Sequence, residues 1–204
     1  MNIPINLAVE DRLSEAVLRR ILSHSDRGYA LGACYKRGGY GYLKKNIRGW
    51  NAAARSVPFI VLTDLDASYP CPGALILDWL PLQQRHNLLF RVAIREVEAW
   101  LIADRTNLAA FLRVPERLIP ENPDRVPDPK RAIVELARKS RDRWMRERIA
   151  PKPKSTASQG PDYNGCLIEF VTAGWDIEAA IAGSESLRRT VRKLHTFTPV
   201  WEEK

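Results

Sequence analysis

Two aspartates follow a short apolar run near the middle of the chain. The run from Phe59 to Leu62 is rich in β-branched and aromatic residues, and Asp64 and Asp66 come after it, separated by one residue. Such a run predicts a buried strand of a parallel sheet, and side chains two apart on an extended backbone point the same way. Two carboxylates on one side offer the hard oxygen ligands that Mg²⁺ or Mn²⁺ prefers. The alternative interpretation is an ordinary polar loop after a strand.

Acidic residues also follow two other expected strands. Glu10 comes after the apolar residues 3–9, and Glu96 and Glu98 come after residues 87–94. Glu10 is a candidate metal ligand or general base, or else a charge that favours the start of the next helix. The carboxyl ends of parallel strands meet at one edge, where clustered carboxylates repel each other unless a cation joins them. If the last strand continues, Glu96 and Glu98 alternate in direction, so only one of them should face a metal.

The first 112 residues alternate apolar strand patterns with helical ones. We expect strands at 3–9, 29–35, 59–62 and 87–94, helices at 11–25, 46–55, 74–84 and 97–112, and a glycine-rich basic loop at 37–45. This alternation predicts an α/β domain with a Rossmann-like, mostly parallel sheet flanked by helices. In open sheets of this kind, ligands bind outside the carboxyl ends of the strands. The acidic residues therefore stand where a site is expected.

The composition changes after Val114. Residues 115–129 hold five prolines and predict a linker with turns. We expect further helices at 130–149, 164–173 and 184–195, and a loop rich in proline, lysine and serine at 151–162. The chain is therefore predicted to form two domains, an α/β domain over 1–114 and a basic helical extension over 115–204 that packs on it.

The order of these motifs resembles the Toprim domain, in which one strand ends in glutamate and a later strand ends in Asp-x-Asp. The resemblance rests on Val9-Glu10 with the helix after it, and on Val61-Leu62-Thr63-Asp64-Leu65-Asp66. Toprim domains occur in topoisomerases, primases, OLD-family nucleases and several phage-defence nucleases. They usually carry glycine after the first glutamate, where this chain has Asp11. Residues 95–104, Arg-Glu-Val-Glu-Ala-Trp-Leu-Ile-Ala-Asp, resemble a signature of small bacterial Toprim-like proteins, some encoded near ATPases in defence contexts.

The resemblance implies metal-dependent phosphodiester chemistry. Asp64 and Asp66 would hold Mg²⁺ or Mn²⁺, and Glu10 would be a ligand or activate water. Glu98 would complete the site and could hold a second ion, as in two-metal nucleases. It is favoured over Glu96 by the position of Glu-Ala-Trp-Leu in the resembling proteins. Topoisomerase activity is not expected, because the chain lacks the large tyrosine-bearing domains that it requires.

The charge of the chain favours an anionic partner, nucleic acid above all. The net charge is +8, and residues 128–154 hold ten Lys and Arg against four Asp and Glu. Tyr40 and Tyr42, in the glycine-rich loop, could stack on bases or face the core. The candidate contacts to nucleic acid are Lys44, Lys45, Arg95, Lys130, Arg131 and Arg141. The alternative is a surface whose charges are only solvated.

Other classes of site and location have little support. The three cysteines are far apart and form no C-x-x-C, and the three histidines are equally scattered. This pattern argues against a zinc site, a disulfide framework and a histidine-based triad. No signal-peptide pattern and no apolar run of membrane-spanning length occurs, so we expect a cytoplasmic protein.

Three functions fit these features. The leading hypothesis is a metal-dependent nuclease or nuclease-like effector, acting on DNA or RNA. The resemblance to defence proteins suggests a role in phage defence with an ATPase partner. The second is a non-catalytic subunit with a degenerate Toprim fold that binds nucleic acid or a partner. The third is a metal-dependent phosphatase or nucleotide hydrolase. Cleavage that vanishes in EDTA would favour the first, and competition between nucleotides and polynucleotides would separate the third from it.

Overall fold

The computed structural model describes residues 2–65 and 67–201, so Asp66 lies outside the described residues. The chain divides into two compact units. The sheet unit comprises Met1–Ile94 and Arg189–Lys204, and the helical unit comprises Arg95–Arg188. The domain boundary expected between residues 114 and 115 falls inside the helical unit.

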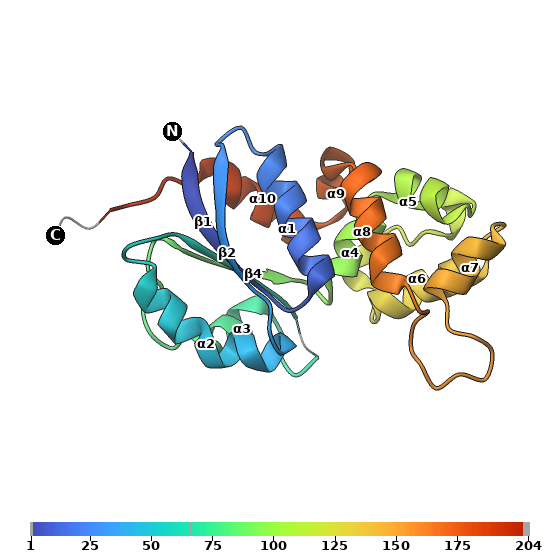
Figure 1. The fold of residues 1–204 in the computed structure, drawn as a ribbon, viewed down its shortest axis with the longest axis horizontal. Helices are drawn as coiled ribbons and strands as arrows, with labels where there is room; N and C mark the ends of the chain where they lie inside the picture. The colour runs from blue at the N-terminus through green and yellow to red at the C-terminus, as the bar shows by residue number, and fades with distance from the viewer. Residues whose placement is uncertain (1, 66, 202–204) are drawn as a thin grey trace. The chain divides into compact units, whose positions relative to one another are not determined.

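Four parallel strands form the centre of the sheet unit, in the order β2-β1-β3-β4 (Figure 1). They are β1 (Ile3–Val9), β2 (Tyr29–Tyr35), β3 (Phe59–Asp64) and β4 (Leu88–Ala93). The α/β fold with a parallel, Rossmann-like sheet is therefore confirmed. β3 runs two residues further than expected, so Asp64 is its last residue and not part of the loop after it.

Helices cover both faces of this sheet. α1 (Arg12–His24) and the end of α10 (Glu185–Thr196) lie on one face, and α2 (Gly39–Ala53) and α3 (Pro72–Trp79) lie on the other (Figure 1). α1 begins where the Asp11 carboxylate accepts a hydrogen bond of 2.8 Å from the backbone N–H of Ser14. Its apolar residues recur at helical spacing and are buried, which fixes the face that it turns to the sheet.

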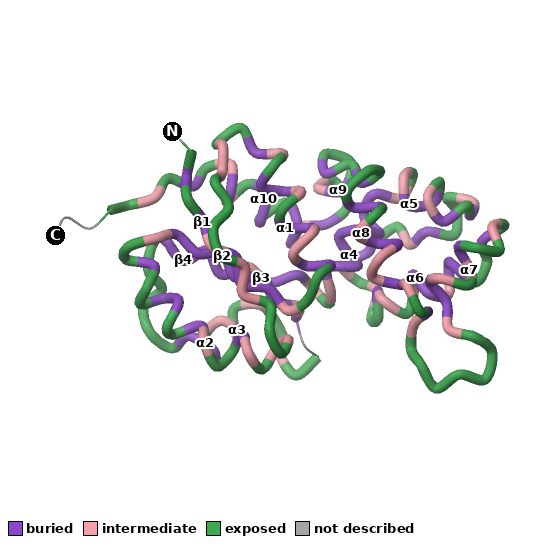
Figure 2. Tube along the Cα trace, viewed as in Figure 1, coloured by how far each residue is buried: buried purple, intermediate pink, exposed green. Residues whose placement is uncertain are grey.

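Aromatic side chains fill the core between the sheet and the helices α2 and α3. Trp50, Phe59, Trp79 and Phe90 belong to this cluster, and the Trp79 and Phe90 rings lie 5.5 Å apart. β1 and β3 are buried along most of their length, whereas β2 is largely exposed at its edge of the sheet (Figure 2). β1, which Glu10 follows, and β3, which ends at Asp64, are therefore both well packed strands.

The prediction of a glycine-rich loop over residues 37–45 is wrong from Gly39 onward. α2 begins at Gly39, and Gly38 and Gly39 have φ angles of 79° and 58°, a left-handed conformation that glycine adopts without steric cost. These two glycines make the turn into the helix. Leu43 and Trp50 then face the core at helical spacing, so the basic residues here lie on a helix surface.

The helical unit, described throughout, contains no strand, which confirms a helical C-terminal half. Its helices are α4 (Val97–Ala103), α5 (Arg105–Leu112), α6 (Pro129–Arg138), α7 (Arg143–Ile149), α8 (Tyr163–Ala173) and α9 (Ile177–Gly183), with short turns η1 (Glu116–Leu118) and η2 (Pro123–Arg125). The single helices expected at 97–112 and 130–149 are each split. Asp104 and Asp142 cause the breaks, because each caps a new helix by accepting backbone N–H bonds.

α4 forms the centre of the helical unit, and all of its residues are buried. The Trp100 indole N–H donates a hydrogen bond of 2.7 Å to the Ser186 hydroxyl. Asp104, after the last turn of α4, accepts a bond of 2.7 Å from the backbone N–H of Asp176. Trp100 and Asp104, both within the signature at residues 95–104, thus make structural contacts to distant parts of this unit.

The helices are all short. The longest within the described part of the chain is α2, with 15 residues, whereas a membrane span needs about 20 apolar residues. Among the described residues, no helix combines the length and apolar character that crossing a membrane requires.

We predict that Gly160→Ala destabilises the helical unit and that Gly49→Ala does not. A Cβ atom at Gly160 would lie 2.6 Å from the backbone carbon of Ile149, whereas one at Gly49 meets nothing within 4 Å. Overpacking of this kind costs about 1–3 kcal/mol, and alanine inside an exposed helix gains up to about 1 kcal/mol over glycine. Urea unfolding followed by circular dichroism measures both effects. Equal midpoints for the two variants would contradict the packing at Gly160.

Candidate functional site

The ends of β1 and β3 lie side by side at the point where the strand order reverses. From β1 the chain continues to β2 on one side, and from β3 it continues to β4 on the other. The loops that leave β1 and β3 therefore diverge, and ligand sites of open α/β sheets occur at such switch points. Glu10 follows β1 and Asp64 ends β3, so both acids stand at this position.

Glu10 is held by the end of β3. Its Oε1 atom accepts a hydrogen bond from the Thr63 hydroxyl and another, of 3.0 Å, from the backbone N–H of Asp64. Thr63 is buried, so its hydroxyl is a fixed donor. Both bonds end on Oε1, and no bond to Oε2 is made within the described part of the chain. The carboxylate is thus oriented through one oxygen, and the other remains available to a ligand.

The two acids suit a hydrated divalent cation. Mg²⁺ often binds through one or two carboxylates and completes its shell with waters and substrate phosphates. Among residues 2–65 and 67–201, no three His, Cys, Asp or Glu side chains come close enough to form a metal site by themselves. Asp66, the third expected ligand, lies outside these residues. The metal role of Glu10, Asp64 and Asp66 stays a prediction.

Glu96 and Glu98 do not alternate along a strand, because the strand does not continue to them. β4 ends at Ala93, Glu96 precedes the first residue of α4, and Glu98 lies in its first turn. Both carboxylates approach the same lysine. Lys130 Nζ lies 3.6 Å from Glu96 Oε1 and 3.7 Å from Glu98 Oε1, and the Lys130 backbone N–H donates to Glu96 Oε2 at 2.8 Å.

Glu98 is the buried member of this cluster in the helical unit, with 3% of its surface exposed. The Tyr163 hydroxyl donates a hydrogen bond of 3.2 Å to Glu98 Oε1. Burial, together with the negative charge of Glu98, raises the pKa of Tyr163 well above its usual range, so the hydroxyl keeps the proton that it donates. Lys130 and Tyr163 together account for a buried carboxylate at this position. Its participation in a metal site with Glu10 stays a prediction.

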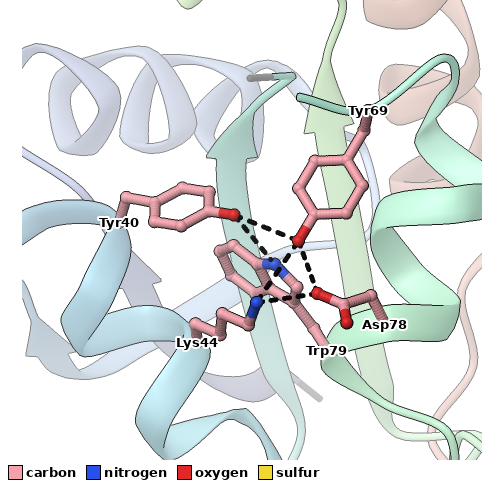
Figure 3. Close-up of polar contacts among 5 residues, drawn as sticks. All are labelled: Tyr40, Lys44, Tyr69, Asp78 and Trp79. Atoms are coloured by element: carbon pink, nitrogen blue, oxygen red, sulfur yellow. Dashed lines mark hydrogen bonds and ion pairs between the residues drawn. The ribbon is translucent and has the colours of Figure 1, made fainter. Parts of the chain in front are cut away.

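Lys44, a candidate contact to phosphate, is engaged in a polar network on the sheet unit (Figure 3). Its Nζ atom lies 2.7 Å from the Asp78 carboxylate and 3.3 Å from the Tyr69 hydroxyl. Tyr69 also bonds to Asp78, and Tyr40 accepts from the Trp79 indole at 3.3 Å. Hydrogen bonds to Asp78 and Tyr69 raise the pKa of Lys44, which stays charged.

The network connects three segments. Lys44 comes from α2, Asp78 comes from α3, and Tyr69 comes from the loop that joins β3 to α3. The loop that leaves Asp64 is therefore anchored at Tyr69 to both helices (Figure 3). The contacts of Lys44 therefore help to hold this loop against α2 and α3.

The other candidate basic residues differ in their surroundings. Lys45, Arg131 and Arg141 are exposed. Arg95 is also exposed and has a φ angle of 68°, an unusual conformation for a residue with a side chain. Lys130 is engaged with the two glutamates described above. Contact of any of them with nucleic acid stays a prediction.

Tyr40 and Tyr42 pack on the core of the sheet unit. Of the two alternatives for these rings, stacking on bases or facing the core, the structure shows the second. The Tyr40 ring meets the Trp79 ring edge-on at 4.7 Å, and the Tyr42 ring meets the Trp50 ring at 5.8 Å. Edge-to-face pairs of this kind are favourable beyond the area that they bury. The two rings therefore stabilise α2 against its neighbours.

Sequence reasoning missed three residues that shape the site. Thr63 precedes Asp64 at the end of β3, and a hydroxyl beside a strand-end acid was a usable signal. Tyr69 and Asp78 gave none, because their contact depends on how α3 returns to α2. Local spacing cannot reveal a contact of that kind.

We predict that Lys130→Met lowers the free energy of unfolding by about 1–2 kcal/mol, because it leaves Glu98 buried without its cation. The loss should be smaller than for a fully buried pair, since Lys130 is 36% exposed. Glu98→Gln in the Lys130→Met background should recover part of the loss. Urea unfolding of the four proteins of this double-mutant cycle gives the coupling. Strictly additive losses would show that Lys130 does not stabilise Glu98.

Comparison with known proteins found no matching family model, no matching curated protein and no matching solved structure. The resemblance to the Toprim family therefore stays a prediction. It rests on the order of Glu10, Asp64 and Asp66 along the chain.

Proposed function

We propose that the chain cleaves phosphodiester bonds of nucleic acid with a divalent metal ion held at the ends of β1 and β3. The observation that carries the proposal is the direct link between Glu10 and the end of β3 at the switch point of the sheet. Two acids from separate strands meet where open α/β sheets bind their ligands.

Glu10, Asp64 and Asp66 are the residues that would hold Mg²⁺ or Mn²⁺. Such an ion supplies a Lewis acid for the phosphoryl oxygen and lowers the pKa of bound water. The protein contributes orientation. Thr63 and the Asp64 backbone fix Glu10 through Oε1. Hydrogen-bond donors that orient a metal ligand in this way commonly account for about 10- to 100-fold in metal affinity.

The charge of the chain supports a polyanionic substrate. A net charge of +8 raises the local concentration of anions and speeds their association. Arg141 and Lys45 are exposed and lie in separate units, so positive charge is available on both parts of the chain. A long nucleic acid uses such dispersed charge better than a mononucleotide does.

We predict that Asp64→Asn and Glu10→Gln each reduce Mg²⁺-dependent cleavage by about 100-fold or more, because a catalytic metal supplies several kcal/mol of transition-state stabilisation. The assay follows labelled DNA and RNA, each single-stranded and duplex, with Mg²⁺, Mn²⁺ or EDTA. Asp11→Asn is the matched control. It removes a carboxylate next to Glu10, and asparagine caps α1 about as well as aspartate.

Cleavage in EDTA, or full activity in the Asp64 and Glu10 variants, would refute a metal centre at these residues. Hydrolysis of nucleotides with no cleavage of polynucleotides would identify a phosphatase or nucleotide hydrolase instead. Metal-independent binding of nucleic acid without any cleavage would identify a binding subunit.

A further inference from the structure

The helical unit has a cavity of about 820 Å³ between α7 and the loop that follows it. Its walls include Trp144, Arg146 and Arg148 from α7, and Pro151, Lys152 and Pro161 from the loop. The volume lies within the range of sites that bind small organic molecules. Proline and tryptophan make the walls apolar, and the cations lie among them.

Trp144 is 52% exposed, although tryptophan usually packs inside a protein. The Arg148 guanidinium lies over the ring, 3.7 Å from its centroid. Arg148 is itself held by Asp162 and lies 3.8 Å from Glu169. The ring is thus fixed by a stacked and anchored arginine while half of its residue surface stays exposed. A fixed aromatic surface at a cavity is suited to stack a flat ligand.

The charge of the walls selects an anionic ligand. Arg138, Arg146, Arg148 and Lys152 line the cavity, and Glu147 is the one acid among the lining residues. Arg138 and Arg148 are paired with Glu135 and Asp162, so the positive charge that a ligand meets comes mainly from Arg146 and Lys152. Glu147 is paired with Arg143 at 2.7 Å, which reduces its repulsion of anions. Lys152 is exposed and has no ion pair within the described residues. The site therefore combines a stacking surface with a positive rim.

We propose that this cavity takes an unpaired base of single-stranded nucleic acid, stacked on Trp144, with an adjacent phosphate at Lys152. Every base has a face that can stack on an aromatic ring, and single strands leave these faces accessible. In a duplex the faces are covered by neighbouring bases. The inference rests on the proposed function only for the class of substrate, since the binding needs no metal and no cleavage.

The test measures binding of the full chain to a fluorescein-labelled 15-nucleotide oligothymidylate by anisotropy, in EDTA. Trp144→Ala should weaken binding by about 5- to 150-fold, the range that stacking of one base supplies. Trp144→Phe should keep most of the affinity, because phenylalanine also offers an aromatic face on which a base can stack. Lys152→Gln should flatten the log–log salt dependence by about 0.7, the value for one phosphate of a single strand.

Trp201→Ala is the matched control, because Trp201 is 51% exposed and belongs to the sheet unit. It should bind the oligonucleotide as the unchanged protein does. A 15-base-pair duplex should compete more weakly than the single strand. Circular dichroism of Trp144→Ala should show an unchanged fold, since the side chain is half exposed.

Equal binding by Trp144→Ala and the unchanged protein would overturn the inference, as would duplex bound more tightly than single strand. So would a Trp144→Ala variant that loses self-association in sedimentation but keeps its oligonucleotide affinity, since the surface would then join two copies of the chain. The outcome of this binding test can be interpreted independently of whether the proposed metal centre at Glu10 and Asp64 is confirmed. Loss of cleavage in Asp64→Asn with intact strand binding supports both, and strand binding without any cleavage leaves this inference standing alone.

Discussion

The contact between Glu10 and the end of β3 is the constraint on which the candidate site depends. The sheet order makes the chain leave β1 and β3 in opposite directions, and open α/β sheets bind their ligands at such a position. Glu10 ties the two strand ends together by accepting bonds from Thr63 and from the Asp64 backbone. A carboxylate oriented this way has lost most of its rotational freedom before any ligand arrives. Preorganisation of that kind lowers the cost of binding.

Glu98 and Glu10 differ in how far their carboxylates are removed from water and in how neighbouring groups satisfy them. Glu98 is buried, and a tyrosine hydroxyl and a lysine satisfy it within the helical unit. Glu10 is only partly buried, and both of its hydrogen bonds from the described residues end on Oε1, so Oε2 takes no bond from them. A residue that must bind a hydrated ion needs the second arrangement, because the ion has to keep some of its waters. The geometry around Glu10 therefore favours ligand binding more directly than the geometry around Glu98 does.

The strands were predictable because each is a run of β-branched or apolar residues with clear limits, and Asp64 was placed correctly at a strand end for that reason. The helix boundaries were not. Asp104 and Asp142 look like ordinary polar positions within long helical patterns, yet each caps a new helix. The positions of Glu96 and Glu98 agree with the expected end of the strand and start of the next helix, and only the alternative in which the strand continues fails. The chain leaves β4 at Ala93, and Arg95 adopts a left-handed conformation that arginine rarely takes, so strand alternation stops before the acids.

The basic segment at residues 128–154 shows why the number of Lys and Arg residues overestimates the positive charge that a surface offers to a ligand. Arg138 pairs with Glu135 and Arg143 pairs with Glu147 along their own helices, and Arg148 pairs with Asp162. These arginines are largely neutralised, the first two by acids three or four residues away on the same helix and Arg148 by an acid 14 residues further along the chain. What remains is a smaller positive field around an exposed ring. Specific binding at such a surface depends less on total charge than on the shape of the cavity beside Trp144. Arg148 contributes there by holding the ring in place, even though its own charge is already matched.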